Sequence, residues 1–240
     1  MAFDPTSIRA LCFDVFGTVV DWRSSVIAEG RALGARLGLR ADWAALTDAW
    51  RRAYYRSMTE VARGERSWDT IDVLHRQELD QLLPRFGLQS IGETDRAHLN
   101  LAWHRLAPWP DTVAGLGRLR QRYVISTLSN GNLSLLVNMA KHAGLPWDAV
   151  LTAELFGHFK PHPAVYQGAA RLLGVAPAQL MMVAAHPADL VAAQGAGLKT
   201  AYVLRPDENG PGAWTDPRGD GVFDLTAASF EDLATQLGID

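Results

Sequence analysis

A single carboxylate, Asp14, stands where an apolar run of the chain ends, and it is well placed to do chemistry. The residues before it, Ile8 to Phe13, are nearly all apolar, which is typical of a strand buried on both faces of a parallel sheet. Ligands of open α/β sheets bind just beyond the carboxyl ends of the strands, so this carboxylate is placed to meet a substrate. The alternative is an Asp that only caps a helix or forms a turn.

Three more polar groups follow later apolar runs in the same way: Ser129 with Asn130, then Lys160, then His186 with Asp189. Because the carboxyl ends of parallel strands share one edge of the sheet, we expect all of these side chains to converge with Asp14 on one cleft. Each group also has an ordinary interpretation. Ser-Asn is a good helix start, a lone Lys is normally solvated, and an Asp after a structural His can cap a helix.

The elements that must position these residues alternate between strand and helix in the second half of the chain. Helical spacing at 111–122 and short connections between later segments indicate βαβ units. The predicted strands are residues 123–129, 149–152, 180–185 and 199–204. This series predicts an α/β fold with a Rossmann-like, doubly wound parallel sheet. The Gly-, Pro- and Asp-rich segment 205–221 is expected to be a surface connection.

Between the first strand and this series the chain has helical spacing with no convincing strand. The predicted helices cover 26–39, 43–61, 69–86 and 94–106. We therefore expect two domains: an α/β core formed by 1–20 and 107–240, and an inserted α-helical cap formed by 21–106.

Composition excludes several classes of partner. The chain has 240 residues, 48% of them hydrophobic, and a net charge of −3. No long Lys/Arg run occurs, so nucleic acid and anionic membranes are not expected partners. The start of the chain does not resemble a signal peptide, and we expect a cytoplasmic protein. Cys12 is the only cysteine, and we expect an inert core thiol.

The polar groups resemble, along the whole chain, the motifs of the haloacid dehalogenase superfamily. They are Asp14-Val15-Phe16-Gly17-Thr18, Ser129-Asn130-Gly131, Lys160-Pro161, and Ala185-His186 followed by Asp189. Most members of that family transfer phosphoryl groups and use a second Asp, two residues after the nucleophile, to bind Mg²⁺ and to protonate the leaving group. This chain has Phe16 at that position, and a phenyl ring can do neither. The chain is therefore most similar to the L-2-haloacid, or type II (S)-2-haloacid, dehalogenase branch, which implies no metal and no cofactor.

The resemblance also implies the chemistry. A carboxylate nucleophile attacks the carbon that bears the halogen, releases halide and becomes an aspartyl ester. Water then attacks the ester carbonyl, so that configuration at the substrate carbon is inverted once. The substrate carries its own carboxylate, which must be held by donors and a cation to offset the repulsion from the nucleophile.

The family's roles map onto the core residues as follows. The resemblance implies that Asp14 is the nucleophile, that Thr18 orients it and that Lys160 keeps it ionised. Asp189 holds Lys160, and Asn130 lines the halide side. The groups that bind the substrate are the backbone amides of Val15 and Phe16 and the side chains of Ser129 and Tyr166. A plain turn threonine and a packing tyrosine are the alternatives for Thr18 and Tyr166.

From the cap, Trp50-Arg51 matches a Trp-Arg pair whose Arg receives the departing halide, although Arg52 and Arg56 are close neighbours in the sequence. Trp68 is a second, weaker halide candidate, with core packing as its alternative.

The fourth motif is the main departure from the dehalogenase pattern. Ala184-Ala185-His186 stands where many members have Ser-Ser-Asn, so two hydroxyls are lost. An imidazole can accept a proton near neutral pH, so His186 with Asp189 could position the hydrolytic water. The residue that activates this water is left open by the sequence.

The expected substrates are short 2-haloalkanoic acids such as haloacetates and L-2-halopropionate, in a small and dry pocket. Turnover of fluoroacetate is a further hypothesis, with His186 and Arg51 donating hydrogen bonds to fluoride. Two other functions stay open: a metal-dependent phosphatase or phosphonate hydrolase on the same fold, and a non-catalytic binding protein. Relatives often form dimers, so a homodimer is allowed, but the sequence does not settle the oligomeric state.

Overall fold

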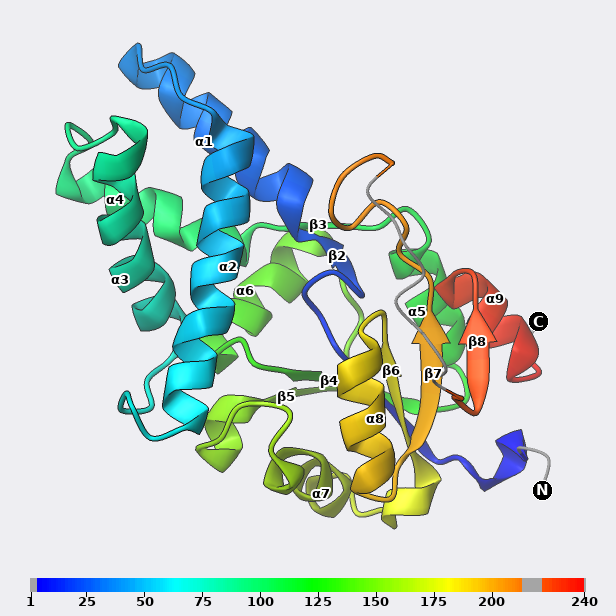
Figure 1. The fold of residues 1–240 in the computed structure, drawn as a ribbon. Coiled ribbons are helices and arrows are strands. Elements are labelled where there is room, and N and C mark those ends of the chain that lie inside the picture. Colours follow the sequence, from blue (N-terminus) through cyan, green and yellow to red (C-terminus); the bar gives the residue numbers. More distant parts are fainter. Residues whose placement is uncertain (1–3, 213–221, 240) are drawn as a thin grey trace.

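A parallel sheet of six strands forms the centre of the molecule, and a group of helices lies to one side of it (Figure 1). The computed structural model describes residues 4–212 and 222–239. The strand order is β5-β4-β1-β6-β7-β8, and every neighbouring pair is parallel. The strands are β1 (Ala10–Phe13), β4 (Val124–Ser129), β5 (Ala149–Thr152), β6 (Leu180–Ala184), β7 (Lys199–Val203) and β8 (Leu225–Ala227). This confirms the predicted Rossmann-like parallel sheet.

Alternate residues of β1 enter two different hydrophobic clusters, because successive side chains of a strand point to opposite faces. Leu11 and Phe13 join the larger cluster, which includes side chains of α5, α6 and α9. Ala10 and Cys12 join the smaller one, with α7 and α8. The helices are α5 (Thr112–Leu119), α6 (Leu133–Ala143), α7 (Pro163–Leu172), α8 (Pro187–Gly195) and α9 (Phe230–Gln236). β1 is therefore buried on both faces, as its apolar sequence predicted.

The helical segment between β1 and β4 is present as expected. It consists of α1 (Trp22–Leu37), α2 (Trp43–Ala62), α3 (Ile71–Leu82) and α4 (Glu93–Asn100), with 3₁₀ turns at Leu83–Phe86 and Leu101–His104. Side-chain caps fix the N-termini of α1 and α2, because Asp21 accepts a hydrogen bond from the Ser24 N–H and Asp42 accepts one from the Ala45 N–H, both at 2.9 Å. None of the described helices is both long and apolar enough to cross a membrane.

A two-stranded antiparallel ribbon marks the place where the chain leaves the core and returns to it. It pairs β2 (Val20–Asp21) with β3 (Ala107–Pro108). Neither this ribbon nor β8 was predicted, because strands of two or three residues are too short to show a period. The domain limits at 20/21 and 106/107 coincide with the ribbon and stay a prediction.

Packing of α5 against α9 gives a stability prediction. A Cβ on Gly115 would lie 2.4 Å from Phe230 Cβ and 2.8 Å from its carbonyl carbon, whereas a Cβ on Gly117 meets nothing within 4 Å. We expect Gly115→Ala to lower the free energy of unfolding by about 1–3 kcal/mol through overpacking. The matched variant Gly117→Ala, on the same helix, should be neutral or stabilising by up to about 1 kcal/mol. Urea unfolding of both proteins tests this, and equal effects would show that α5 does not pack as described.

Candidate active site

A cavity of about 720 Å³ opens between the carboxyl edge of the sheet and α2. Its wall combines core residues, among them Asp14, Lys160 and His186, with the cap residues Arg51 and Tyr54. The sequence suggested a small pocket, and the volume is larger than an acid of two or three carbons requires. The polar groups nevertheless gather around Asp14, so they define where a small substrate would bind.

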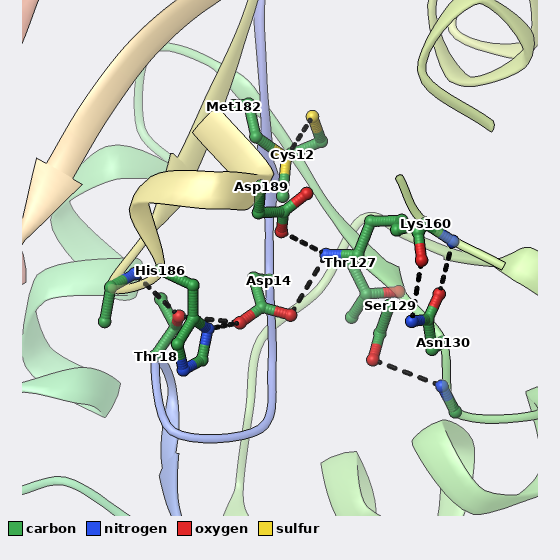
Figure 2. Close-up of polar contacts among 12 residues, drawn as sticks. Cys12, Asp14, Thr18, Thr127, Ser129, Asn130, Lys160, Met182, His186 and Asp189 are labelled. Carbon is green, nitrogen blue, oxygen red and sulfur yellow. Dashed lines mark hydrogen bonds and ion pairs between the residues drawn. The ribbon is translucent and has the colours of Figure 1, made fainter. Parts of the chain in front are cut away.

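Asp14 follows the last residue of β1 and is 7% exposed. The Thr18 hydroxyl donates to Asp14 Oδ2 at 2.9 Å and accepts from the Ala185 N–H at 2.9 Å. Thr18 thus ties Asp14 to the loop after β6 (Figure 2), and its role in orienting a nucleophile stays a prediction.

Lys160 Nζ lies between two carboxylates, 3.0 Å from Asp14 Oδ1 and 2.5 Å from Asp189 Oδ2 (Figure 2). Burial alone would raise the pKa of Asp14, but the Lys160 and His186 cations hold it well below its ordinary value. Burial would lower the pKa of Lys160, and the two carboxylates raise it instead. The nucleophile candidate is therefore ionised and its neighbour is a cation.

Asp189, in the first turn of α8, holds Lys160 from the other side and accepts from the Tyr166 hydroxyl at 2.5 Å. Burial and the nearby Asp14 charge raise the pKa of Asp189, against the effect of Lys160. Tyr166 is buried and lines the cavity. Its hydroxyl is engaged with Asp189, so Tyr166 supports the Lys160 pair as well as packing.

Ser129 and Asn130 are neighbours in the sequence, but only Asn130 lines the cavity. Asn130 Oδ1 accepts from the Lys160 N–H at 2.7 Å, and its side chain lines the cavity. Ser129 is buried, accepts from the Gly131 N–H at 3.3 Å, and is not among the residues that line the cavity. The structure thus does not bring the Ser129 hydroxyl to the cavity wall, and its role toward a substrate stays a prediction.

His186 lies between two carboxylates. Nδ1 is 2.9 Å from Asp14 Oδ2, and Nε2 is 3.0 Å from both oxygens of Glu208. Two carboxylates can each accept only if both ring nitrogens carry protons, so this geometry belongs to the imidazolium. Burial would lower the pKa of His186, but Glu208 and Asp14 raise it well above its ordinary value.

Glu208 is the functional residue that the sequence did not indicate. The Gly, Pro and Asp content of segment 205–221 predicts a surface connection. This is wrong for Arg205 and Glu208, which are buried, whereas Pro206 and Asp207 are exposed and residues 213–221 lie outside the described residues. Glu208 is 8% exposed, and Arg205 is buried, donating to both oxygens of Asp111 at 2.8 and 3.0 Å. The available signal was position, since this segment directly follows the carboxyl end of β7.

Trp22 and Gly17 fix where the Glu208 side chain lies. Trp22 Nε1 donates to Glu208 Oε1 at 3.1 Å. Gly17 has φ +86°, and a Cβ there would lie 2.0 Å from the same oxygen. Only glycine provides both this backbone conformation and the space. Burial would raise the pKa of Glu208, while the His186 cation lowers it.

Arg51, on α2, is a cationic cap residue on the cavity wall. Its guanidinium carbon lies over four aromatic rings, at distances from 4.7 Å for Tyr55 to 5.6 Å for Phe16. Its Nε and Nη1 are buried and have no hydrogen-bond partner among the described residues. A buried cation with free donors is a site for an anion.

Two other predicted residues lie behind the cavity wall. Trp68 stacks on Phe159 with ring centroids 5.8 Å apart, and only Phe159 lines the cavity. Val15 is buried in the core cluster, whereas the ring of Phe16 reaches the wall. Trp68 therefore packs beneath the cavity surface, and its predicted contact with halide has no support from this position.

Among the charged side chains that line the cavity, Asp14, Asp189 and Glu208 are met by Lys160, His186 and Arg51, and two further cations, Arg63 and Arg205, also lie on its wall. Within the described ranges, no group of three or more His, Cys, Asp or Glu side chains is arranged to hold a metal ion. The place between Asp14 and Asp189 is taken by the Lys160 ammonium. The arrangement suits a carboxylate nucleophile acting on a small anionic substrate, and does not fit Mg²⁺, which needs several oxygen ligands.

Comparison with known proteins agrees with this chemistry. The family model described as haloacid dehalogenase-like hydrolase matches residues 8–197. The (S)-2-haloacid dehalogenase of Xanthobacter autotrophicus is 32% identical over 82% of this chain and 76% of its own length. The (S)-2-haloacid dehalogenase 1 of Pseudomonas sp. (strain CBS-3) is 30% identical over 82% and 85%.

Two solved structures are similar to nearly the whole chain. A crystal structure of an L-2-haloacid dehalogenase is 48% identical with a TM-score of 0.93, covering 96% of this chain and 99% of that one. A crystal structure of a defluorinating L-2-haloacid dehalogenase is 41% identical with a TM-score of 0.94, covering 99% and 100%.

The ion pair between Lys160 and Asp14 gives the prediction from this site. We expect Lys160→Met to raise the pKa of Asp14 by about 1–3 units, because one of the two cations that oppose its burial is removed. An NMR titration with ¹³C-labelled aspartate carboxyls measures this shift. The control is Lys199→Met, which removes a Lys–Asp pair of the same length, 3.0 Å to Asp224, outside the cavity. An Asp14 titration that is the same in both variants would contradict the assigned role of Lys160.

Proposed function

The chain belongs to the haloacid dehalogenase-like hydrolases, in the branch of the (S)-2-haloacid dehalogenases, and on this premise we propose that it hydrolyses short 2-haloalkanoic acids to 2-hydroxy acids. It is a hydrolase that acts on carbon–halide bonds. The observation that carries the proposal is the buried, ionised Asp14 between Lys160 and His186. The same cavity holds the Arg51 Nε and Nη1 donors, which have no hydrogen-bond partner in the described part of the chain. Haloacetates and L-2-halopropionate are the proposed substrates.

In the first step, an Asp14 oxygen attacks the substrate carbon from the side opposite to the halogen. The carbon–halogen bond breaks as the carbon–oxygen bond forms, which leaves an alkyl ester on Asp14 and a free halide ion. Arg51 is assigned to the halide, because its buried Nε and Nη1 have no other partner among the described residues. Developing negative charge on the leaving group is stabilised most by a cation that already lies in a dry, apolar site.

The substrate carboxylate needs its own donors. An ammonium group has three N–H donors, and Asp14 and Asp189 take two of those of Lys160. We assign the third to the substrate carboxylate, together with the amides of Val15 and Phe16 and the cavity-lining Asn130. Ser129 is the least supported member of this set, because its side chain does not line the cavity.

In the second step, water attacks the Asp14 carbonyl carbon rather than the substrate carbon. The oxygen of the ester carbonyl gains negative charge, and the Lys160 ammonium or the Thr18 hydroxyl, which lie against the two Asp14 oxygens, stabilises it. Because only the first step occurs at the substrate carbon, its configuration is inverted once.

The two rival functions fit the site less well. A phosphatase of this fold needs an acidic, metal-binding residue at position 16, where this chain has Phe16, whose ring lies under Arg51. The place between the Asp14 and Asp189 carboxylates is occupied by the Lys160 ammonium. A binding protein without catalysis would not need a carboxylate whose pKa is held low by two cations at the cost of its desolvation.

Fluoroacetate is proposed as a further substrate. Fluoride is the poorest leaving group among the halides and is strongly hydrated, so it needs the strongest donors. The buried guanidinium of Arg51 supplies them, and a protein 41% identical to this chain is a defluorinating dehalogenase. Both ring nitrogens of His186 face carboxylates, so Arg51 is preferred over His186 as the fluoride donor. A cytoplasmic homodimer stays a prediction.

A single turnover in ¹⁸O-labelled water tests the ester mechanism. With enzyme in excess over chloroacetate and with EDTA present, we expect chloride release and ¹⁸O in the Asp14 carboxylate, found by mass spectrometry of the peptide. The first product should contain oxygen from the enzyme, because water attacks the Asp14 carbonyl carbon. Asp14→Asn should release chloride at least about a thousandfold more slowly.

Direct appearance of ¹⁸O in the hydroxy acid would contradict the covalent mechanism. Loss of activity in EDTA would support the metal-dependent rival. If the native protein and the Asp14→Asn variant both bind halogenated acids equally well and neither turns them over, the protein is a binding protein.

The assignment of Arg51 to halide predicts a dependence on the leaving group. Arg51→Lys keeps the charge and removes the planar array of donors. We expect release of halide to fall about tenfold or more for fluoroacetate, and less for chloroacetate and bromoacetate, because better leaving groups need less stabilisation. The control is Arg52→Lys on the same helix, since Arg52 is exposed and does not line the cavity. Equal losses for all three halides would contradict the assignment.

A further inference from the structure

We propose that Glu208 positions His186 as the base for ester hydrolysis, and that alkylation of Asp14 is the event that makes His186 able to act as a base. This inference rests on the proposed function and extends it to a residue outside the four motifs. It assigns the activation of the hydrolytic water to His186, in a chain whose fourth motif is Ala184-Ala185-His186 followed by Asp189.

The geometry gives His186 a fixed orientation. Nε2 lies 3.0 Å from both oxygens of Glu208, so Nδ1 must face Asp14, at 2.9 Å from Oδ2. Glu208 is itself held by Trp22 Nε1 and has no space to move toward Gly17. An imidazole held by a carboxylate on one nitrogen, with the other nitrogen facing the reacting carbonyl, is the arrangement that a general base requires.

In the resting enzyme, this imidazole cannot accept a proton. Both of its nitrogens donate to carboxylates, so both are protonated. The charges around the ring are Asp14 and Glu208 in direct contact, Lys160 on the far oxygen of Asp14, and Arg51 and Arg205 acting on Glu208. In this state His186 is a cation that helps to keep the nucleophile ionised.

Alkylation changes one of these charges. When Asp14 becomes an ester it loses its negative charge, and the Nδ1 proton of His186 loses its anionic acceptor. The pKa of the ring then falls toward its ordinary value, and the Nδ1 proton passes to water in the cavity. The overall reaction, R–X + H₂O → R–OH + H⁺ + X⁻, releases one proton per turnover, and this is the proton that leaves.

Hydrolysis then restores the resting state. Neutral Nδ1 takes one proton from the attacking water as its oxygen bonds to the Asp14 carbonyl carbon. The bond between that carbon and the alkoxide oxygen breaks, and the second proton of the water goes to the alkoxide to give the hydroxy acid. Asp14 is again a carboxylate and His186 is again an imidazolium, so both groups have regained the charges that they carry in the resting enzyme.

Glu208→Gln separates the two steps. Gln keeps the shape of the side chain and removes its charge. We expect the burst of chloride from chloroacetate, which reports alkylation, to stay within about threefold of the native rate. Decay of the alkyl-enzyme, followed by intact-protein mass spectrometry, should slow about 10- to 100-fold, so that the ester accumulates.

The pH dependence of ester decay distinguishes a base-positioning role from a structural one. In the native protein the decay rate should rise with pH through the pKa of His186 in the ester state and then level off. Removal of the Glu208 charge favours the neutral ring, so this rise should move to lower pH by about 1–3 units in Glu208→Gln. His186→Asn should slow decay and abolish the rise.

The control is Glu78→Gln, which removes another buried carboxylate. Glu78 is 3% exposed, accepts from Ser57 and Arg56, and does not line the cavity. Its variant should leave the burst, the decay and the pH profile unchanged. The inference is overturned if Glu208→Gln decays at the native rate with the native pH profile, or if alkylation slows as much as decay. Absence of any chloride burst in the native protein would instead overturn the proposed function.

Discussion

The structure depends on keeping one carboxylate charged in a place from which most water is excluded. Burial opposes the ionised form of Asp14, and the folded protein meets this with Lys160 at 3.0 Å and His186 at 2.9 Å. Each cation in turn needs its own anion, since an unpaired buried charge is costly. Asp189 and Glu208 fill these places. Two cations and their two anionic partners are thus required to keep Asp14 ionised and reactive.

The fold supplies these residues from separate strand ends and not from one segment. Asp14 follows β1, His186 follows β6 and Glu208 lies in the loop after β7, while Asn130, after β4, accepts from the backbone of Lys160. Parallel strands bring all of these ends to one edge. The cap adds Arg51 from α2 and Trp22 from α1, so that the anion site and the support of Glu208 both come from outside the sheet.

The sequence was most informative where position alone decides the outcome. The apolar run before Asp14 and the alternating elements after residue 111 predicted the sheet, and the strand-end rule placed Lys160 and Asp189 beside Asp14. It was least informative where a long side chain reaches back across a loop. Nothing in the Gly- and Pro-rich composition after β7 shows that Glu208 turns inward, and helical spacing cannot show that Trp68 stacks under Phe159 while Arg51 enters the cavity.

The loss of two hydroxyls in Ala184-Ala185-His186 changes how the site handles charge through a reaction cycle. Neutral donors would lose less of their hydrogen-bond strength when Asp14 is esterified, whereas an imidazolium binds the carboxylate strongly and the ester weakly. When Asp14 becomes an ester, its negative charge leaves with the halide, and the anions that remain in the cavity are Asp189, Glu208 and the carboxylate of the bound acid. The imidazolium of His186 then has one carboxylate in direct contact instead of two, and this change allows it to release its Nδ1 proton. The only group whose protonation must change is the one that lies between Asp14 and Glu208.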